Sequence, residues 1–207
     1  MHITHTPLTF ADHTLHIVEF DPASFHEHDL LWLPHHTQLQ SCGRKRKAEH
    51  LAGRIAAVHA LREFSHKTVP GIGAQRQPLW PQNLFGSISH SGTIALAAVS
   101  THPVGLDIET IFTQQMANEL VSSIVTNTEK AWLANSGLSV EQALTLAFSA
   151  KESAFKATQA SQQSVAEFTQ YQIVELQHNQ MILRAHSQAY RVQWRFSGND
   201  VITLATV

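Results

Sequence analysis

The sequence has one cysteine, few charged residues and no long apolar run. Cys42 is the single cysteine among 207 residues, which excludes an internal disulfide framework and any cysteine-rich zinc module. The longest apolar run, Ile94 to Val99, is far shorter than the about 20 residues that span a bilayer. The first residues show no basic start followed by an apolar stretch, so no signal peptide is expected. We therefore expect a cytoplasmic protein without a membrane span.

Several catalytic and metal-binding signatures are also missing. The sequence contains no H-E-x-x-H or Cys/His zinc spacing, no Walker loop or kinase signature, and no G-x-S-x-G hydrolase elbow. Histidine, in contrast, is abundant, with 15 residues, eight of them before residue 37. Most are expected on the surface, where they make the net charge depend on pH near about 6.

Charge is nearly balanced overall but unevenly distributed. There are 14 Lys and Arg against 16 Asp and Glu, and the first basic residues form a run, Arg44 to Lys47, with Arg54 shortly after. A local basic patch indicates a phosphate-bearing small ligand or an acidic surface, and a solvated helix start is the bland alternative. A nucleic-acid binder usually has a basic domain overall, so nucleic acid is not an expected partner.

The hydrophobic pattern predicts an α+β protein. The 207 residues are enough for one domain or two small ones, and 43% of them are hydrophobic, which is typical of a globular protein. Three- and four-residue spacing of apolar residues predicts a helix over 44–64, and Pro and Gly predict a loop over 68–81. The elements expected after the loop are three consecutive strands of one sheet at 84–89, 93–99 and 104–109, capping boxes at Thr126 and Ser139, a helix at 140–159, and a hairpin over 190–207. Two similar-sized lobes, 1–103 and 104–207, fit this order.

Two carboxylates, Asp107 and Glu109, lie two residues apart at a predicted strand end. Both side chains therefore point to the same face, where a divalent cation would relieve their repulsion. Hard oxygen ligands favour Mg²⁺. A solvated strand end is the alternative.

The predicted helix 140–159 has an alanine stripe that lets another backbone approach closely. Glu152 and Lys156 lie on the opposite, polar side, where an ordinary surface pair is the alternative reading. Lys151 falls near the apolar arc and could snorkel or mark the rim of a site. A further strand end carries Ser89 and His90, which could contact a phosphate. Taken together, the residues indicate metal-dependent transfer or hydrolysis of a phosphoanhydride.

The motifs resemble those of the 4′-phosphopantetheinyl transferase superfamily. Three segments carry the resemblance in the expected order: Ile88-Ser89-His90-Ser91, Val104-Gly105-Leu106-Asp107-Ile108-Glu109 and Phe148-Ser149-Ala150-Lys151-Glu152-Ser153-Ala154-Phe155-Lys156. The segments 44–54 and 76–81 resemble the siderophore branch. Two departures stand out, because many relatives have Trp at the position of Phe148 and Lys at that of Gln77, where Arg76 could take over phosphate binding.

The resemblance implies a fold, a reaction and a set of roles. The fold would be two pseudo-symmetric lobes with coenzyme A between them, and the reaction would transfer its 4′-phosphopantetheine arm to a carrier-protein serine, releasing adenosine 3′,5′-bisphosphate. Glu152, directly or through a metal-bound water, would be the base, and Lys156 would contact the pyrophosphate. The other implied roles are Mg²⁺ binding by Asp107, Glu109 and Glu152, and coenzyme A binding by Arg46, Arg54, Arg76, Ser89, His90 and Lys156.

The expected partners are apo acyl, peptidyl or aryl carrier domains, the last two belonging to a nonribosomal peptide synthetase that makes a catecholate siderophore. The enzyme is expected to act as a monomer. Three alternatives stay open: a metal-dependent phosphohydrolase of a nucleotide anhydride, an inactive module that binds a carrier or coenzyme A, and a nucleic-acid binder suggested only by residues 44–47.

Overall fold

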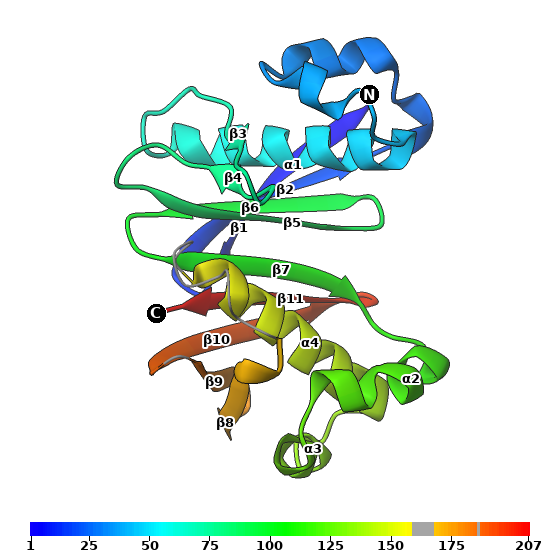
Figure 1. Cartoon of the computed structure of the whole chain (residues 1–207), viewed down its shortest axis with the longest axis vertical. Coiled ribbons are helices and arrows are strands. Elements are labelled where there is room, and N and C mark those ends of the chain that lie inside the picture. Colours follow the sequence, from blue (N-terminus) through cyan, green and yellow to red (C-terminus); the bar gives the residue numbers. More distant parts are fainter. Residues whose placement is uncertain (159–167, 186) are drawn as a thin grey trace. The chain divides into compact units, whose positions relative to one another are not determined.

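The computed structural model describes residues 1–158, 168–185 and 187–207, which form two compact units, Met1–Thr101 and His102–Val207. Each unit contains an antiparallel sheet with α-helix packed on it (Figure 1). The predicted mixture of helices and strands is confirmed. None of the described helices combines the length and the apolarity that a membrane-spanning segment needs.

The first unit is built on a four-stranded sheet of order β1-β2-β6-β5. One long helix, α1, packs along β2, β6 and β5, and its alanines and leucines share a core with residues such as Val18 and Ala97. The elements are β1 (Ile3–Phe10), β2 (His13–Phe20), η1 (Pro22–Ser24), η2 (Glu27–Trp32), η3 (His36–Leu39), α1 (Arg44–Arg62), β3 (Gly71–Ile72), β4 (Pro78–Leu79), β5 (Phe85–Ser91) and β6 (Ile94–Ser100). The predicted helix over 44–64 is thus confirmed, and the predicted loop over 68–81 contains a two-residue ladder, β3–β4.

The second unit is built on a five-stranded sheet of order β7-β11-β10-β9-β8. The helix α4 packs on β7 and β11, and α2 and α3 pack on α4. The elements are β7 (Val104–Thr110), α2 (Gln114–Ile124), α3 (Asn127–Ala134), α4 (Val140–Ala157), η4 (Phe168–Gln170), β8 (Gln172–Leu176), β9 (Gln180–Ala185), β10 (Gln188–Ser197) and β11 (Asp200–Thr206). Both predicted capping boxes form, at Thr126 with Glu129 and at Ser139 with Gln142, and the C-terminal hairpin is confirmed as β10–β11.

The prediction that 84–89, 93–99 and 104–109 form consecutive strands of one sheet is wrong for the third strand. β5 and β6 pair with each other, but β7 pairs with β11 in the second sheet. The reason is that β6 is already flanked on both sides, by β5 and by β2, which is distant in sequence. A short connection between two strands does not show whether they pair.

Lys151 is wholly buried, neither snorkelling to solvent nor marking a rim. Its Nζ lies 2.8 Å from Glu129 Oε1 and donates to the backbone oxygen of Ile124 at 2.7 Å. Glu129 also accepts from the backbone N–H groups of Thr126 and Ile173. Burial lowers the pKa of Lys151, while the partner carboxylate opposes that shift. The pair is a sealed structural element that joins α3, α4 and β8.

Gly105 lets α4 lie directly on β7. A β-carbon at this position would come within 1.8 Å of the backbone oxygen of Ser153 and 2.6 Å of the backbone nitrogen of Ala157. The alanine stripe of α4 is buried as predicted and extends the same close contact: Ala143, Ala147, Ala150, Ala154 and Ala157. Small residues on both elements therefore set the distance between them.

We expect Gly105→Ala to lower the free energy of unfolding by more than about 4 kcal/mol, because the clash is with backbone that cannot rotate away. Denaturant unfolding would measure the loss. Gly43→Ala is the matched control, since a β-carbon there meets nothing within 4 Å. Similar unfolding midpoints for the two variants would contradict the close approach of α4 to β7.

Candidate active site

The carboxylates predicted to bind metal lie on β7 and α4 of the second unit. Asp107 occupies the middle of β7, opposite Thr203 of β11, and is only 2% exposed. Glu109 follows two residues later on the same strand, and Glu152 lies on α4. Both glutamates are half-buried. The strand and the helix that packs on it thus bring residues 45 positions apart in sequence to one place.

Asp107 is held by two side chains of α4. Lys156 Nζ donates to Asp107 Oδ1 at 2.7 Å, and Ser149 Oγ donates to Asp107 Oδ2 at 2.8 Å. The same ammonium group donates to the backbone oxygen of Leu106 at 3.2 Å. Thr203 Oγ1 donates to the backbone oxygen of Ser149, which adds a β11 contact. The orientation of Asp107 is therefore fixed by charge and by hydrogen bonds before any ligand binds.

Glu109 and Glu152 are carboxylates whose charge is poorly compensated. Burial, followed by the charge of Asp107, raises the pKa of Glu109 to about 7, although Lys156 opposes the shift. Burial also raises the pKa of Glu152, again against the effect of Lys156. Two desolvated carboxylates next to a third favour a bound cation. Oxygen donors are the ligands that Mg²⁺ prefers, so the chemistry of this donor set fits that ion.

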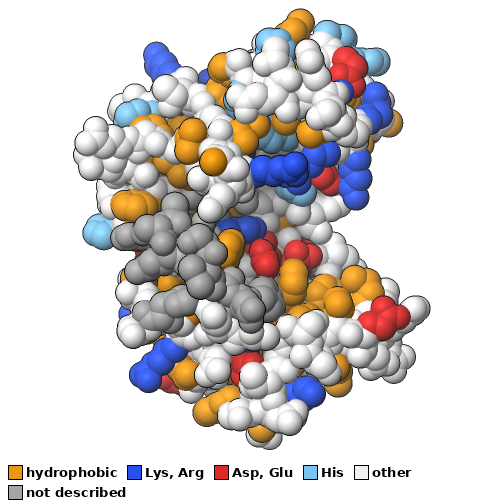
Figure 2. Space-filling model, viewed as in Figure 1, with side chains coloured by type: hydrophobic (Ala, Val, Ile, Leu, Met, Phe, Trp, Pro, Cys, Tyr) orange, Lys and Arg blue, Asp and Glu red, His pale blue; other side chains and the backbone are white. Residues whose placement is uncertain are grey.

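A second group of the predicted site residues lines a pocket within the first unit. Arg46, His50 and Arg54 recur every four residues, so they lie along one face of α1. The strand β5 and the segment after β3 complete the lining, which consists of Arg46, Glu49, His50, Gly53, Arg54, Arg76, Pro78, Ile88 and His90. Figure 2 shows Lys and Arg side chains gathered close together, with His side chains among them, on the surface of this unit. Three guanidinium groups around one pocket favour the binding of an anion.

Arg54 has a structural task as well. It is 5% exposed, and its Nε and Nη2 donate to the backbone oxygens of Pro70 and Gly71 at 2.8 and 3.0 Å. Burial, followed by the charge of Arg46, lowers its pKa to about 10. The guanidinium thus anchors the segment that carries Arg76 and also contributes charge to the pocket.

His50 and Glu49 affect the electric charge of the pocket. The Nε2 atoms of His50 and His35 lie 2.8 Å apart, and burial, followed by the charge of Arg54, lowers the pKa of His50 to about 3. His50 is therefore neutral at pH 7 beside the arginines. Glu49 lies 3.8 Å from Nδ1 of His90 and 3.8 Å from Nζ of Lys45. These contacts place one compensating negative charge among the cations.

The structure divides the predicted site residues into these two groups. Arg46, Arg54, Arg76 and His90 line the pocket of the first unit, whereas Asp107, Glu109, Glu152 and Lys156 gather on β7 and α4. Ser89 is buried, and because strand residues alternate, its side chain lies on the other face of β5 from pocket-lining Ile88 and His90.

The basic residues Arg44 to Lys47 do not all face the pocket, because two of them make contacts within the fold. Lys47 pairs with Glu27 at 2.9 Å, and Arg44 donates to backbone oxygens of the segment at 22–25. Only Arg46 of this run lines the pocket. Ser149, Glu49 and His50 were not predicted from the sequence. Ser149 stands inside a motif already singled out, and the four-residue spacing of 46, 50 and 54 is the signal that could have found His50.

The comparisons with known proteins decide the family. A family model described as "4′-phosphopantetheinyl transferase N-terminal domain" matches residues 35–100, and one described as "4′-phosphopantetheinyl transferase superfamily" matches residues 103–205. The chain belongs to the 4′-phosphopantetheinyl transferase superfamily. Enzymes of this superfamily use coenzyme A as substrate and transfer its phosphopantetheine arm to a carrier protein, and this chain is such a transferase.

Individual relatives match over nearly the whole chain. "Enterobactin synthase component D" of Escherichia coli (strain K12) is 57% identical over 204 residues, covering 99% of this chain and 98% of the relative. The protein of that name from Salmonella typhi is 53% identical over 98% of this chain and 90% of its own length. "4′-phosphopantetheinyl transferase Npt" of Nocardia iowensis is 30% identical over 55% of this chain and 52% of its own length.

The neutral state of His50 predicts acid sensitivity. Its folded pKa of about 3 lies below the ordinary 6.5, so the folded protein binds fewer protons than the unfolded chain between these values. His50 therefore contributes stability that is present above pH 6.5 and is lost as the pH falls toward 3. We expect Tm to drop more between pH 7 and pH 5 in the unmodified protein than in His50→Gln.

The control is His28→Gln, because the His28 side chain is 74% exposed. Thermal unfolding in matched buffers would give both pH differences. If His50→Gln and the unmodified protein lose the same number of degrees, His50 is not held neutral by its surroundings.

Proposed function

We propose that this transferase moves the 4′-phosphopantetheine arm of coenzyme A to a serine of peptidyl or aryl carrier domains, in a nonribosomal peptide synthetase that makes an enterobactin-type siderophore. The observation that carries the proposal is the 57% identity over almost the full chain to a relative named enterobactin synthase component D. The grouping of Asp107, Glu109, Glu152 and Lys156 on β7 and α4 supports an active enzyme rather than a binding module.

In the proposed reaction, the serine hydroxyl oxygen attacks the phosphorus that carries the pantetheine arm. A new P–O bond forms to serine, the P–O–P bridge breaks, and adenosine 3′,5′-bisphosphate leaves with the bridging oxygen. Glu152, directly or through a metal-bound water, accepts the serine proton, and burial, which raises its pKa above the ordinary value, makes it a stronger base. Lys156 stabilises the negative charge that develops on the leaving phosphate.

Asp107, Glu109 and Glu152 would hold Mg²⁺, which lowers the charge of the pyrophosphate when bound. The chain's own residues prepare this position. Ser149 and Lys156 fix the two oxygens of Asp107, and burial keeps Glu109 and Glu152 poorly solvated. A preorganised set of donors costs little reorganisation during the reaction.

The phosphates of coenzyme A are proposed ligands of Arg46, Arg54, Arg76 and His90, which line one pocket. Ser89 would have to meet the nucleotide from the other face of β5, outside that pocket. The proposal treats residues 1–103 and 104–207 as two related lobes that share one coenzyme A. Its support is that each unit has a long helix, α1 or α4, packed on an antiparallel sheet, and that the two family models match one part each. We further propose that the enzyme is cytoplasmic and works as a monomer on apo carrier domains.

The deciding experiment is intact-protein mass spectrometry of an apo carrier domain incubated with the enzyme, coenzyme A and Mg²⁺. We expect the carrier to gain one phosphopantetheine group, and a carrier with its serine replaced by alanine to gain none. Coenzyme A consumed without any gain on aryl, peptidyl or acyl carriers would indicate a phosphohydrolase. Neither gain nor consumption would indicate a binding module.

In the same assay, Glu152→Gln should lower kcat by about 100-fold or more, because the variant loses a general base and a metal ligand. Glu141→Gln, in the first turn of the same helix, is the control and should retain kcat. Thermal unfolding would show that both variants are folded. Full activity in a folded Glu152→Gln would remove this residue from the mechanism.

Arg46→Gln tests the pocket on α1. We expect KM for coenzyme A to rise about tenfold or more with little change in kcat, because a hydrogen bond to a charged group contributes about 1.5–3 kcal/mol. Lys45→Gln removes the neighbouring positive charge, which does not line the pocket, and should leave KM nearly unchanged. Equal increases in KM would mean that the run acts through its overall charge and not through this pocket.

A further inference from the structure

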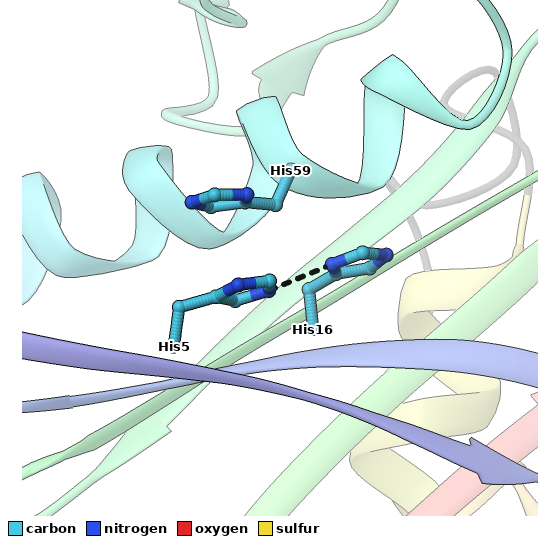
Figure 3. Close-up of side chains that lie close together, drawn as sticks. All are labelled: His5, His16 and His59. Atoms are coloured by element: carbon cyan, nitrogen blue, oxygen red, sulfur yellow. Dashed lines mark hydrogen bonds between the residues drawn. The ribbon is translucent and has the colours of Figure 1, made fainter.

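Three histidines of the first unit meet, and none of them is among the residues assigned to catalysis. His5 lies on β1, His16 on β2 and His59 on α1, and Figure 3 shows their rings side by side. One ring nitrogen of each lies within 4.8 Å of those of the other two. Among the described residues, no other group of three or more His, Cys, Asp or Glu side chains has its ligand atoms all within 4.8 Å of one another.

The fold brings the three residues together from distant parts of the sequence. In the β1–β2 register, His5 stands opposite Val18 and Pro7 opposite His16, so the two histidines are diagonal neighbours on one face. Val18 belongs to the core that α1 covers, which places this face toward the helix. The ring centroids of His5 and His59 are 3.7 Å apart and those of His5 and His16 are 5.1 Å apart, with all rings nearly parallel.

The hydrogen bonds orient a lone pair of His16 into the cluster. His16 Nε2 lies 3.0 Å from Glu63 Oε1, and an ionised carboxylate can only accept, so the proton of neutral His16 is on Nε2. Nδ1 of His16 is then the unprotonated nitrogen, and it faces Nε2 of His5 at 2.9 Å. Histidines that bind metals commonly donate their second N–H to a carboxylate in this way.

We propose that His5, His16 and His59 bind a divalent late transition-metal ion, with Zn²⁺ as the occupant to be tested, and that this ion ties the β1–β2 hairpin to α1. Imidazole nitrogens suit such ions, whereas Mg²⁺ prefers oxygen. The site shares no residue with the carboxylates on β7 and α4. Three protein ligands leave one tetrahedral position for water, and the half-buried His5 and His59 leave a route for the ion.

Binding requires a modest rearrangement. Zn–N bonds of about 2.1 Å put ligand nitrogens roughly 3.4 Å apart in a tetrahedron, which is within the spread of the present atoms. Ring lone pairs lie in the ring plane, so the stacked rings of His5 and His59 must turn toward a common point. Both side chains are only half-buried, so neither ring is enclosed on all sides.

The charges around the cluster allow a cation. Burial, followed by the neighbouring His5, lowers the pKa of His59 to about 4, and burial also lowers the pKa of His5. Both shifts favour the unprotonated rings, so protons compete less strongly for their nitrogens. Arg62 is close enough to contribute to these shifts and would repel a metal ion, whereas the Glu63 carboxylate offsets that repulsion.

The test is calorimetric titration of Zn²⁺ into tag-free, chelator-treated protein, because 15 histidines give a background of weak binding. We expect one site that fills before the others and a Tm that rises when it is filled. His59→Gln should weaken this site by about 100-fold or more, and Glu63→Gln by about tenfold. His28→Gln, which removes an exposed histidine of the same unit, should leave it unchanged.

Co²⁺ provides a second readout. Its visible absorption should report a site with three nitrogen ligands, and the band should be lost in His59→Gln and in His5→Gln. Tm measured in EDTA shows whether these variants fold; they are chosen because replacing buried His16 could disturb the fold itself. Equal Zn²⁺ affinity in His59→Gln, His5→Gln and His28→Gln, or the absence of any site tighter than the background, would overturn the proposal.

Discussion

The packing of α4 against β7 is the contact on which the catalytic group depends. Gly105 places no β-carbon between the two backbones, and the alanine stripe of the helix places nothing longer than a methyl group there. At that distance Ser149 and Lys156 of the helix reach opposite oxygens of Asp107. A separation larger by one methyl group would break both contacts, because hydrogen bonds of 2.7–2.8 Å have little length to spare. The close packing of α4 on β7 therefore determines where the side chains of this site lie.

The second unit contains buried charges of two kinds. The pair of Lys151 and Glu129 is enclosed, and each group has further hydrogen bonds to backbone. Glu109 and Glu152 are desolvated next to another acid, and their pKa values are raised. Among the described residues, no buried side-chain nitrogen or oxygen lacks a partner. The fold thus satisfies its buried polar atoms yet keeps two carboxylates in an unfavourable charge state, a pattern typical of functional sites.

Much of this organisation could be predicted from local sequence. Helix spacing at 44–64, the capping boxes at Thr126 and Ser139 and the alternation before the last turn all report short-range geometry, and each corresponds to an element. Strand partnership could not be predicted in the same way, because β7 pairs with a strand about a hundred residues later. Nor could the burial of Lys151, which depends on where Glu129 of another helix lies.

The candidate site shows the same division. Strand alternation singled out Asp107 and Glu109 as a candidate pair, because it is a local rule, whereas the role of Glu152 was implied only by the resemblance to the family. The residues that orient or compensate them were missed. Ser149 became meaningful only through its contact with Asp107, and Glu49 through its contacts with Lys45 and His90. Residues that support a site are recognised by their contacts with residues distant in sequence, and these contacts cannot be predicted from local spacing.

Gly105, Asp107 and Glu109 depend on one another for their positions. They are alternate residues of β7, so they share the face of the strand that α4 covers. The intervening Leu106 and Ile108 are buried, Ile108 at 1% exposure. A residue inserted or deleted between Gly105 and Glu109 would exchange the two faces of the strand. Carboxylates would then point to the face now occupied by Leu106 and Ile108, and these apolar side chains would point to the proposed metal position. Leu106 and Ile108 can therefore be exchanged for other apolar residues, whereas a change in the length of this segment would displace the carboxylates.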